Sequence, residues 1–181
     1  NMDRPGQSGG KACANLLFGH ANPGGRLAET WPLSYADVPF GEDFAKSSVE
    51  VYKESIYVGY RYYLSAEKAV RFPFGFGLSY TSFEIADAQV KQENQEIAVS
   101  CTVRNTGRRR GAEVVQVYVS VPQSGVNRPM RELRAFCKVH LDAGESRRAE
   151  LKIPLSELRY FDIGKNEWVM EGGEYEVQIC S

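Results

Sequence analysis

The chain has 181 residues, which is enough for one ordinary domain with an appendage or for two very small domains. Its 43% hydrophobic and 25% charged residues are typical of a globular protein and exclude a disordered chain. No apolar run approaches the roughly 20 residues that span a bilayer, so we expect no membrane partner. The 22 basic and 23 acidic residues give a net charge of −1, and we therefore expect no nucleic-acid partner.

The cysteines and histidines do not predict a metal site or any other cofactor. Four cysteines lie far apart and form no CxxC pair, at Cys13, Cys101, Cys137 and Cys180. We interpret them as free thiols, and Cys101, Cys137 and Cys180 are expected to be buried because they are in phase with apolar strand residues. A Cys101–Cys137 disulfide is an alternative if the two strands face each other. His20 and His140 have no third ligand nearby, and His140 should face solvent because it is out of phase with Val139 and Leu141.

Residues 1–40 predict a helix, a turn and a strand. Apolar residues recur at helical spacing from Gly9 to Phe18, with Ser8 as a candidate cap and Gly19 as the end. A turn at 22–25 leads into a predicted strand over 26–31. One helix and one strand cannot bury their own apolar faces. This segment is therefore predicted to be the last part of a larger layered α/β domain.

Residues 41–78 are predicted to be a linker. Residues 33–50 have the mixed composition of a loop. Residues 51–83 hold ten of the chain's aromatic residues, which are 9 Phe, 10 Tyr and 2 Trp in all. Proline and glycine interrupt this aromatic stretch, which therefore favours an extended path over a helix. Its aromatic side chains should be buried between two bodies.

Residues 79–181 predict an all-β domain. Apolar residues alternate with polar ones in seven short runs that turns separate: 83–90, 97–103, 115–121, 133–141, 149–155, 168–170 and 175–179. One apolar face per strand is typical of two packed antiparallel sheets, so we expect a mainly β, seven-stranded sandwich of the fibronectin type III or immunoglobulin kind. In this register Val117 lies in the core, and a charge at Gln116 should be tolerated at the surface.

Three stretches in chain order resemble family 3 glycoside hydrolases. The segment from Ala14 to Pro32, with Asn22-Pro23-Gly24-Gly25-Arg26-Leu27, resembles the end of that family's α/β sandwich domain. Val58–Tyr63 and Phe72–Tyr80 are similar to the linker, although Gly75-Phe76-Gly77 stands where the family often has Gly-His-Gly and Ser55 replaces a family glycine. Arg104–Gly107, Gly111–Val119 and Arg128–Leu133 resemble the C-terminal fibronectin type III-like domain.

The resemblance implies a retaining β-glycosidase, often a β-glucosidase, whose two catalytic carboxyl groups stand about 5–5.5 Å apart. In the family these groups come from the N-terminal barrel and from an earlier part of the α/β domain, and neither region matches this sequence. We therefore assign no catalytic residue. The resemblance implies a non-catalytic C-terminal portion that docks onto and stabilises upstream catalytic domains. The alternative is a freestanding β-sandwich module that binds carbohydrate or a surface partner.

Four further features remain as expectations. Arg61, Tyr62 and Tyr63 are weak candidates for the outer part of a sugar pocket, but packing between domains is the preferred interpretation. Trp168 is expected to fill the core or a sheet edge rather than to serve as a carbohydrate platform. Arg108–Arg110 should form a solvated loop tip. The apolar residues of 1–40 should be buried partly by the linker aromatics and partly by a homodimer partner.

Overall fold

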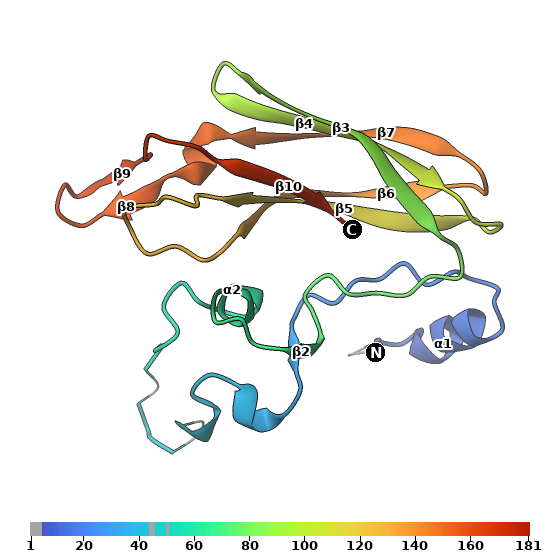
Figure 1. Ribbon diagram of the computed structural model, residues 1–181. Helices are drawn as coiled ribbons and strands as arrows, with labels where there is room; N and C mark the ends of the chain where they lie inside the picture. Colours follow the sequence, from blue (N-terminus) through green and yellow to red (C-terminus); the bar gives the residue numbers. More distant parts are fainter. Residues whose placement is uncertain (1–4, 44–45, 50) are drawn as a thin grey trace.

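The computed structural model describes residues 5–43, 46–49 and 51–181, so residues 1–4 of the predicted α/β segment lie outside the described part. Its centre is a sandwich of two antiparallel sheets, ordered β3-β4-β7 and β10-β5-β6 (Figure 1). The strands are β3 (Phe83–Glu93), β4 (Glu96–Asn105), β5 (Gly111–Ser120), β6 (Glu132–Leu141), β7 (Ser146–Pro154) and β10 (Glu176–Cys180). The predicted mainly β, fibronectin type III-like fold is confirmed.

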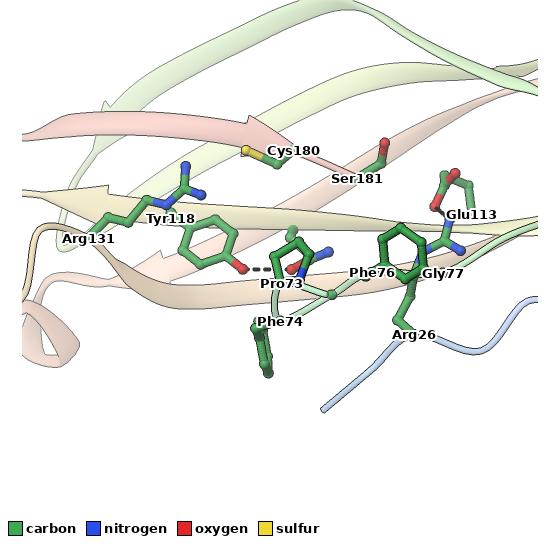
Figure 2. A pocket seen from close by; sticks show the side chains of 12 residues that line it. Arg26, Pro73, Phe74, Phe76, Gly77, Glu113, Tyr118, Arg131, Cys180 and Ser181 are labelled. Atoms are coloured by element: carbon green, nitrogen blue, oxygen red, sulfur yellow. Dashed lines mark hydrogen bonds and ion pairs between the residues drawn. The ribbon is translucent and has the colours of Figure 1, made fainter. Parts of the chain in front are cut away.

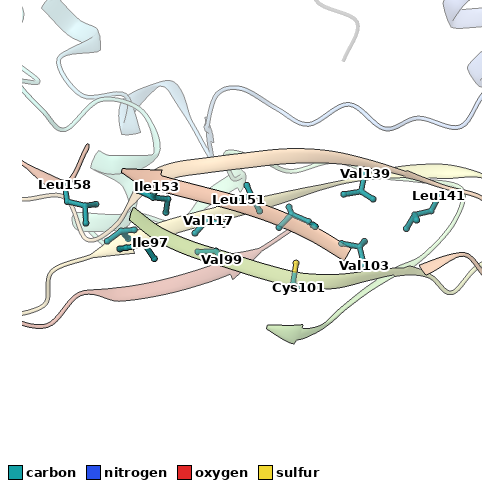
Figure 3. Packing of buried hydrophobic residues seen from close by; sticks show 13 residues of the cluster. Ile97, Val99, Cys101, Val103, Val117, Val139, Leu141, Leu151, Ile153 and Leu158 are labelled. Atoms are coloured by element: carbon teal, nitrogen blue, oxygen red, sulfur yellow. The ribbon is translucent and has the colours of Figure 1, made fainter. Parts of the chain in front are cut away.

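The alternating residues of four strands form the core between the sheets (Figure 3). They are Ile97, Val99, Cys101 and Val103 of β4; Val115, Val117 and Val119 of β5; Val139 and Leu141 of β6; and Ala149, Leu151 and Ile153 of β7. Leu158, which ends the 3-10 helix η3 (Leu155–Leu158), closes one end of the cluster. Burying a side chain of this size contributes about 1.5–3 kcal/mol, so this row of residues is the main source of the fold's stability.

The last third of the domain differs from the expected seven strands. The run around Trp168 forms β9 (Glu167–Val169), which pairs with an additional strand, β8 (Tyr160–Asp162), in a separate two-stranded sheet. Trp168 was expected in the core or at a sheet edge; it is 64% exposed, so the core is excluded and it lies on a strand of this two-stranded sheet. Strand alternation identified the run but could not show that its partner is a short neighbouring strand instead of one of the main sheets.

Strand β5 is buried on both faces. Gln116 and Tyr118 point away from the core, yet they are only 5% and 4% exposed, and Ser120 is 8% exposed. The N-terminal segment and the linker lie along this side of the β10-β5-β6 sheet and cover it (Figure 1). The prediction that Gln116 lies at a tolerant surface is therefore wrong.

The N-terminal segment contains the predicted helix but not the predicted strand. Helix α1 spans Gly9–Leu17 and is followed by Phe18 and by Gly19 at φ +72°, although Ser8 makes no side-chain capping bond. Only β1 (Trp31–Pro32) is a strand, and it pairs with β2 (Val70–Phe72) of the linker. Residues 26–27 are not part of a strand and residues 28–29 form a bend. The backbone partners of Leu27 are in a linker loop: Leu27 N–H donates to Phe76 O and Gly75 N–H donates to Leu27 O.

The linker is not extended throughout, which corrects that prediction. It contains α2 (Tyr60–Ser65), which begins after Gly59 at φ +59°. Tyr60 of this short helix points toward the sandwich, where its ring meets that of Tyr118 edge-on, whereas Tyr63 packs against Tyr62. Before it, the expected loop holds the 3-10 helices η1 (Tyr35–Asp37) and η2 (Gly41–Asp43).

All four cysteines are free thiols, but of the three strand cysteines that were expected to be buried, Cys101 is buried and Cys137 and Cys180 are only half-buried. Cys101 is fully buried, and burial raises the pKa of its thiol, with the nearby Cys137 as a further cause. Burial likewise raises the pKa of Cys137. His140 is exposed, as expected. Within the described residues, no helix has the length and apolar character needed to cross a membrane.

Candidate functional site

The seam, which we define as the contact between residues 16–29 and 57–80 and the outer face of the β10-β5-β6 sheet, contains a buried ion pair. Arg26 of the N-terminal segment pairs with Glu113 of β5, and their side chains are only 13% and 7% exposed. Glu113 Oε1 also accepts the backbone N–H of Val114 at 2.7 Å. Figure 2 shows this pair at one end of a cavity of about 390 Å³ whose walls come from the linker and the sheet.

Aromatic side chains from α2 and the following loop fill the rest of the seam. Tyr60 stacks on Phe74 with ring centroids 4.9 Å apart and meets Tyr118 edge-on at 5.8 Å. The hydroxyl of Tyr118 donates to Gln116 Oε1 at 2.7 Å, and burial raises the pKa of Tyr118 to about 12. The phenol is therefore neutral at physiological pH, and it acts as a packing and hydrogen-bonding group.

Tyr60 also satisfies a backbone group of the sandwich, which leads to a prediction. Its hydroxyl oxygen accepts the N–H of Leu133 at 2.8 Å. Tyr60→Phe keeps the ring but removes this acceptor, so we expect a loss of about 1–2 kcal/mol in unfolding free energy. Denaturant unfolding of Tyr60→Phe and of Tyr52→Phe measures the effect, and Tyr52, which is 92% exposed, should show no change. Equal stability of both variants would contradict the role of this hydroxyl.

Asn22 joins three segments at the other end of the seam. Its Oδ1 accepts Tyr80 N–H at 2.8 Å and the Ser79 hydroxyl at 3.1 Å, while its Nδ2 donates to Arg110 O at 3.0 Å. The Tyr80 hydroxyl donates to Leu16 O at 3.0 Å, which ties α1 to the linker. The tip at Arg108–Arg110 is exposed as expected, but it also takes part in these contacts.

The three candidate residues of the sequence analysis all lie in α2. Tyr63 is 7% exposed and meets Tyr62 edge-on at 5.2 Å. The Arg61 guanidinium is 3.6 Å from the Glu132 carboxylate of β6. These contacts favour packing in the seam, and a sugar-pocket role for the three stays a prediction.

The Arg26–Glu113 pair was not predicted from the sequence. The available signal was a lone carboxylate at Glu113 inside the apolar run 111–119, because a charge there must be paired if it is buried. The position of its partner, 87 residues earlier, has no local signature.

The second feature is an apolar face formed by the N-terminal segment and by Leu78 at the end of the linker. A groove of about 850 Å³ runs beside α1 and the β1–β2 pair. Leu17 and Phe18 beside it are 76% and 78% exposed, Leu78 is 72% exposed and Leu33 is 52% exposed. We call these four residues, with Leu16 and Trp31 of the groove wall, the apolar face. Large exposed apolar surfaces mark interaction sites, so this surface is suited to docking.

Three carboxyl groups, those of Asp43, Glu145 and Glu171, have a lowered pKa, which is the opposite of what a glycosidase acid requires. Such an acid needs a raised pKa. Burial alone would raise the pKa of Glu171, but hydrogen bonds from Ser124, Gly125 and Arg128 lower it. A hydrogen bond from Lys53 lowers the pKa of Asp43, and one from the Asp142 backbone lowers that of Glu145. In the part of the chain that the structure describes, no group of three His, Cys, Asp or Glu residues could hold a metal ion.

The fold and the seam define a fibronectin type III-like sandwich joined to the end of an α/β domain, and comparisons with known proteins agree. Residues 2–80 match the glycosyl hydrolase family 3 C-terminal domain, and residues 113–181 match the fibronectin type III-like domain. The chain belongs to glycoside hydrolase family 3, of which it carries the C-terminal part.

The relatives are much longer than this chain. A β-glucosidase from Kluyveromyces marxianus is 42% identical over 176 residues, which are 94% of this chain and 20% of that protein. An exo-α-(1→6)-L-arabinopyranosidase from Bifidobacterium breve is 41% identical over 96% of this chain and 23% of its own length. The structure of β-glucosidase 3B from Thermotoga neapolitana in complex with glucose is 41% identical, with a TM-score of 0.89 over 96% of this chain and 25% of that one. The chain thus spans about a fifth to a quarter of the length of these relatives.

Proposed function

We propose that this chain is the non-catalytic C-terminal portion of a retaining β-glycosidase of the β-glucosidase type, and that it docks onto and stabilises the upstream catalytic domains. The apolar face carries the proposal. Leu17, Phe18 and Leu33 lie on the segment that the buried Arg26–Glu113 pair holds in place, and Leu78 lies two residues before Tyr80, whose N–H donates to Asn22. A fixed apolar surface binds with little loss of conformational entropy, because its backbone is already ordered.

A chimera tests the docking role. The matching 176-residue span of the Kluyveromyces marxianus β-glucosidase is replaced by this chain, and hydrolysis of an aryl β-glucoside is measured. We expect the chimera to hydrolyse the glycoside and this chain alone to show none, since no catalytic carboxyl pair is assigned to it. Turnover by the purified chain that disappears when one of its carboxylates is mutated would overturn the non-catalytic assignment.

Variants of the apolar face make the test specific. Leu17→Lys with Phe18→Lys should lower the melting temperature and the activity of the chimera, because two charges would enter the docked surface. Lysine suits the C-terminal end of α1, so the helix itself should persist. The control is Val90→Lys on β3, at a residue that is 45% exposed on the sandwich. If the chimera with the double substitution is as stable and active as the control, the apolar face is not the docking surface.

The homodimer expected through residues 1–40 uses the same face. We infer that a second copy occupies it when catalytic domains are absent, because both partners cover the same apolar residues. Sedimentation velocity of the isolated chain measures this association. Leu17→Lys with Phe18→Lys should give a monomer, and a concentration-independent monomer of the unaltered chain would exclude the dimer.

One specific observation favours the alternative, a freestanding module that binds carbohydrate. Trp168 and Phe161 are exposed on the sandwich rather than in its core. This observation does not compete with docking, because the pair lies on a different part of the molecule (Figure 1).

A further inference from the structure

The β8–β9 hairpin presents two aromatic rings to solvent. Phe161 and Trp168 lie directly opposite each other in the ladder, as do Tyr160 and Val169 one position away. Alternation sends these two pairs to opposite faces. Tyr160 and Val169 are partly buried, whereas Phe161 is 45% and Trp168 is 64% exposed.

The rings are held in a defined arrangement. Their centroids are 5.7 Å apart and their planes are inclined by 72°, so the edge of one ring meets the face of the other. At the hairpin tip, Asp162 Oδ1 accepts the N–H groups of Gly164 at 2.9 Å and Lys165 at 3.2 Å. Both rings are therefore ordered before any ligand arrives, and little entropy is lost when one binds.

Contacts beneath the hairpin fix it to the sandwich. The Arg128 guanidinium lies 5.2 Å from the centre of the Tyr160 ring. Its Nε donates to Glu171 Oε2 at 3.0 Å, and the two side chains are 10% and 15% exposed. The platform is thus supported by a buried ion pair on the side away from solvent.

The exposed area of Phe161 and Trp168 indicates what size of ligand they could bind. Phe and Trp side chains expose about 150–250 Å² each when free, so this pair offers on the order of 200 Å². A stable protein–protein interface needs about 800 Å² from each partner, which the pair cannot provide even with the exposed Ile163 of the hairpin tip. The hairpin and α1 also lie at opposite ends of the molecule, so the apolar face does not extend to it (Figure 1).

The charges around the rings are balanced locally, and one further apolar side chain, Ile163 at the hairpin tip, is 87% exposed. The Lys165 ammonium is 3.6 Å from Asp162 Oδ2, and it compensates that carboxylate. Arg159 is exposed two residues before Phe161, and alternation places it on the same face as the two rings. A small apolar surface beside a hydrogen-bond donor suits a neutral ligand that combines an apolar face with hydroxyl groups.

We propose that Trp168 and Phe161 form a binding platform for a β-linked glucan chain. In β-glucopyranose the hydroxyls are equatorial, so both ring faces present weakly positive C–H groups that suit the negative face of an indole. A β-1,4-linked chain is a flat ribbon that offers such faces repeatedly. Trp168 stacks on one sugar ring, Phe161 holds the indole at its angle, and Arg159 donates to hydroxyls. This site goes beyond the docking role and does not depend on it.

Affinity electrophoresis of the full 181-residue chain tests the platform. We expect gels that contain hydroxyethylcellulose to retard the chain, while gels that contain dextran, an α-linked glucan, do not. Trp168→Ala should weaken binding by about tenfold or more, and Phe161→Ala should weaken it less. Phe136→Ala is the matched control, because Phe136 is 68% exposed on β6 and should leave binding unchanged.

A second measurement does not depend on the alanine variant being folded. The chain has 2 Trp residues, Trp31 and Trp168, so its NMR spectrum has two indole N–H signals. Titration with a short β-1,4-glucan should move the signal that disappears in Trp168→Phe and leave the other in place. Equal retardation by dextran, equal losses in Phe136→Ala and Trp168→Ala, or an unmoved Trp168 signal would each overturn the proposal. Binding can fail in these tests while the chimera stays active, so the two proposals are separable.

Discussion

Val117→Asp is expected to unfold the sandwich, with a loss of about 4 kcal/mol or more in unfolding free energy. Val117 is 0% exposed between the two sheets, and its neighbours across the core are aliphatic. A carboxylate there has neither water nor a cation to stabilise its charge. Thermal unfolding monitored by circular dichroism measures the effect, and we expect little or no folded protein at 37 °C, since such a loss is comparable to the whole stability of a small domain.

Val90→Asp is the matched control, because the same substitution is made on β3 at a side chain that is 45% exposed. Its cost should stay below about 1 kcal/mol. Similar losses for the two variants would contradict the register of β5. Gln116→Asp is not a suitable control, since Gln116 is 5% exposed beneath the linker and a charge there is also expected to destabilise.

Removing one partner of the Arg26–Glu113 pair is expected to cost about 3–5 kcal/mol, because the other charge stays buried without compensation. Arg26→Ala should also release the N-terminal segment from the seam, and limited proteolysis should then cut residues 20–56 while the sandwich stays intact. Arg26→Met with Glu113→Leu removes both charges and should recover most of the loss. Denaturant unfolding of the two single variants and the double variant gives the coupling free energy.

The exposed pair of Arg147 and Glu145 is the control for this cycle. Its atoms are 2.7 Å apart, but the side chains are 56% and 34% exposed. Arg147→Ala should therefore change stability by less than about 1 kcal/mol. Additive losses in the Arg26–Glu113 cycle, with no coupling beyond that of an exposed pair, would show that the buried pair does not hold the seam together.

The candidate site could be predicted only in part. The aromatic stretch 51–83 was expected to have buried aromatics, and this holds only in part: Tyr63 is buried and most of the others are half-buried, but Tyr52, Phe76 and Tyr80 are exposed. The helix at Tyr60–Ser65 was not predicted, because its 6 residues are too few to show helical periodicity. Its stability comes from tertiary contacts such as the Tyr60 hydroxyl and the Arg61–Glu132 pair.

Sequence alone determined the sandwich core and the helix at the start of the chain. Alternation at Val99, Cys101 and Val103 and helical spacing before Gly19 are local patterns, and each strand or helix buries the face that its own pattern makes apolar. Tertiary structure decided whether the other faces are covered. Gln116 is buried and Trp168 is exposed because the linker lies over β5 and not over the β8–β9 hairpin. Such coverage, like the pairing of Arg26 with Glu113, joins segments far apart in the chain, and no local pattern encodes it.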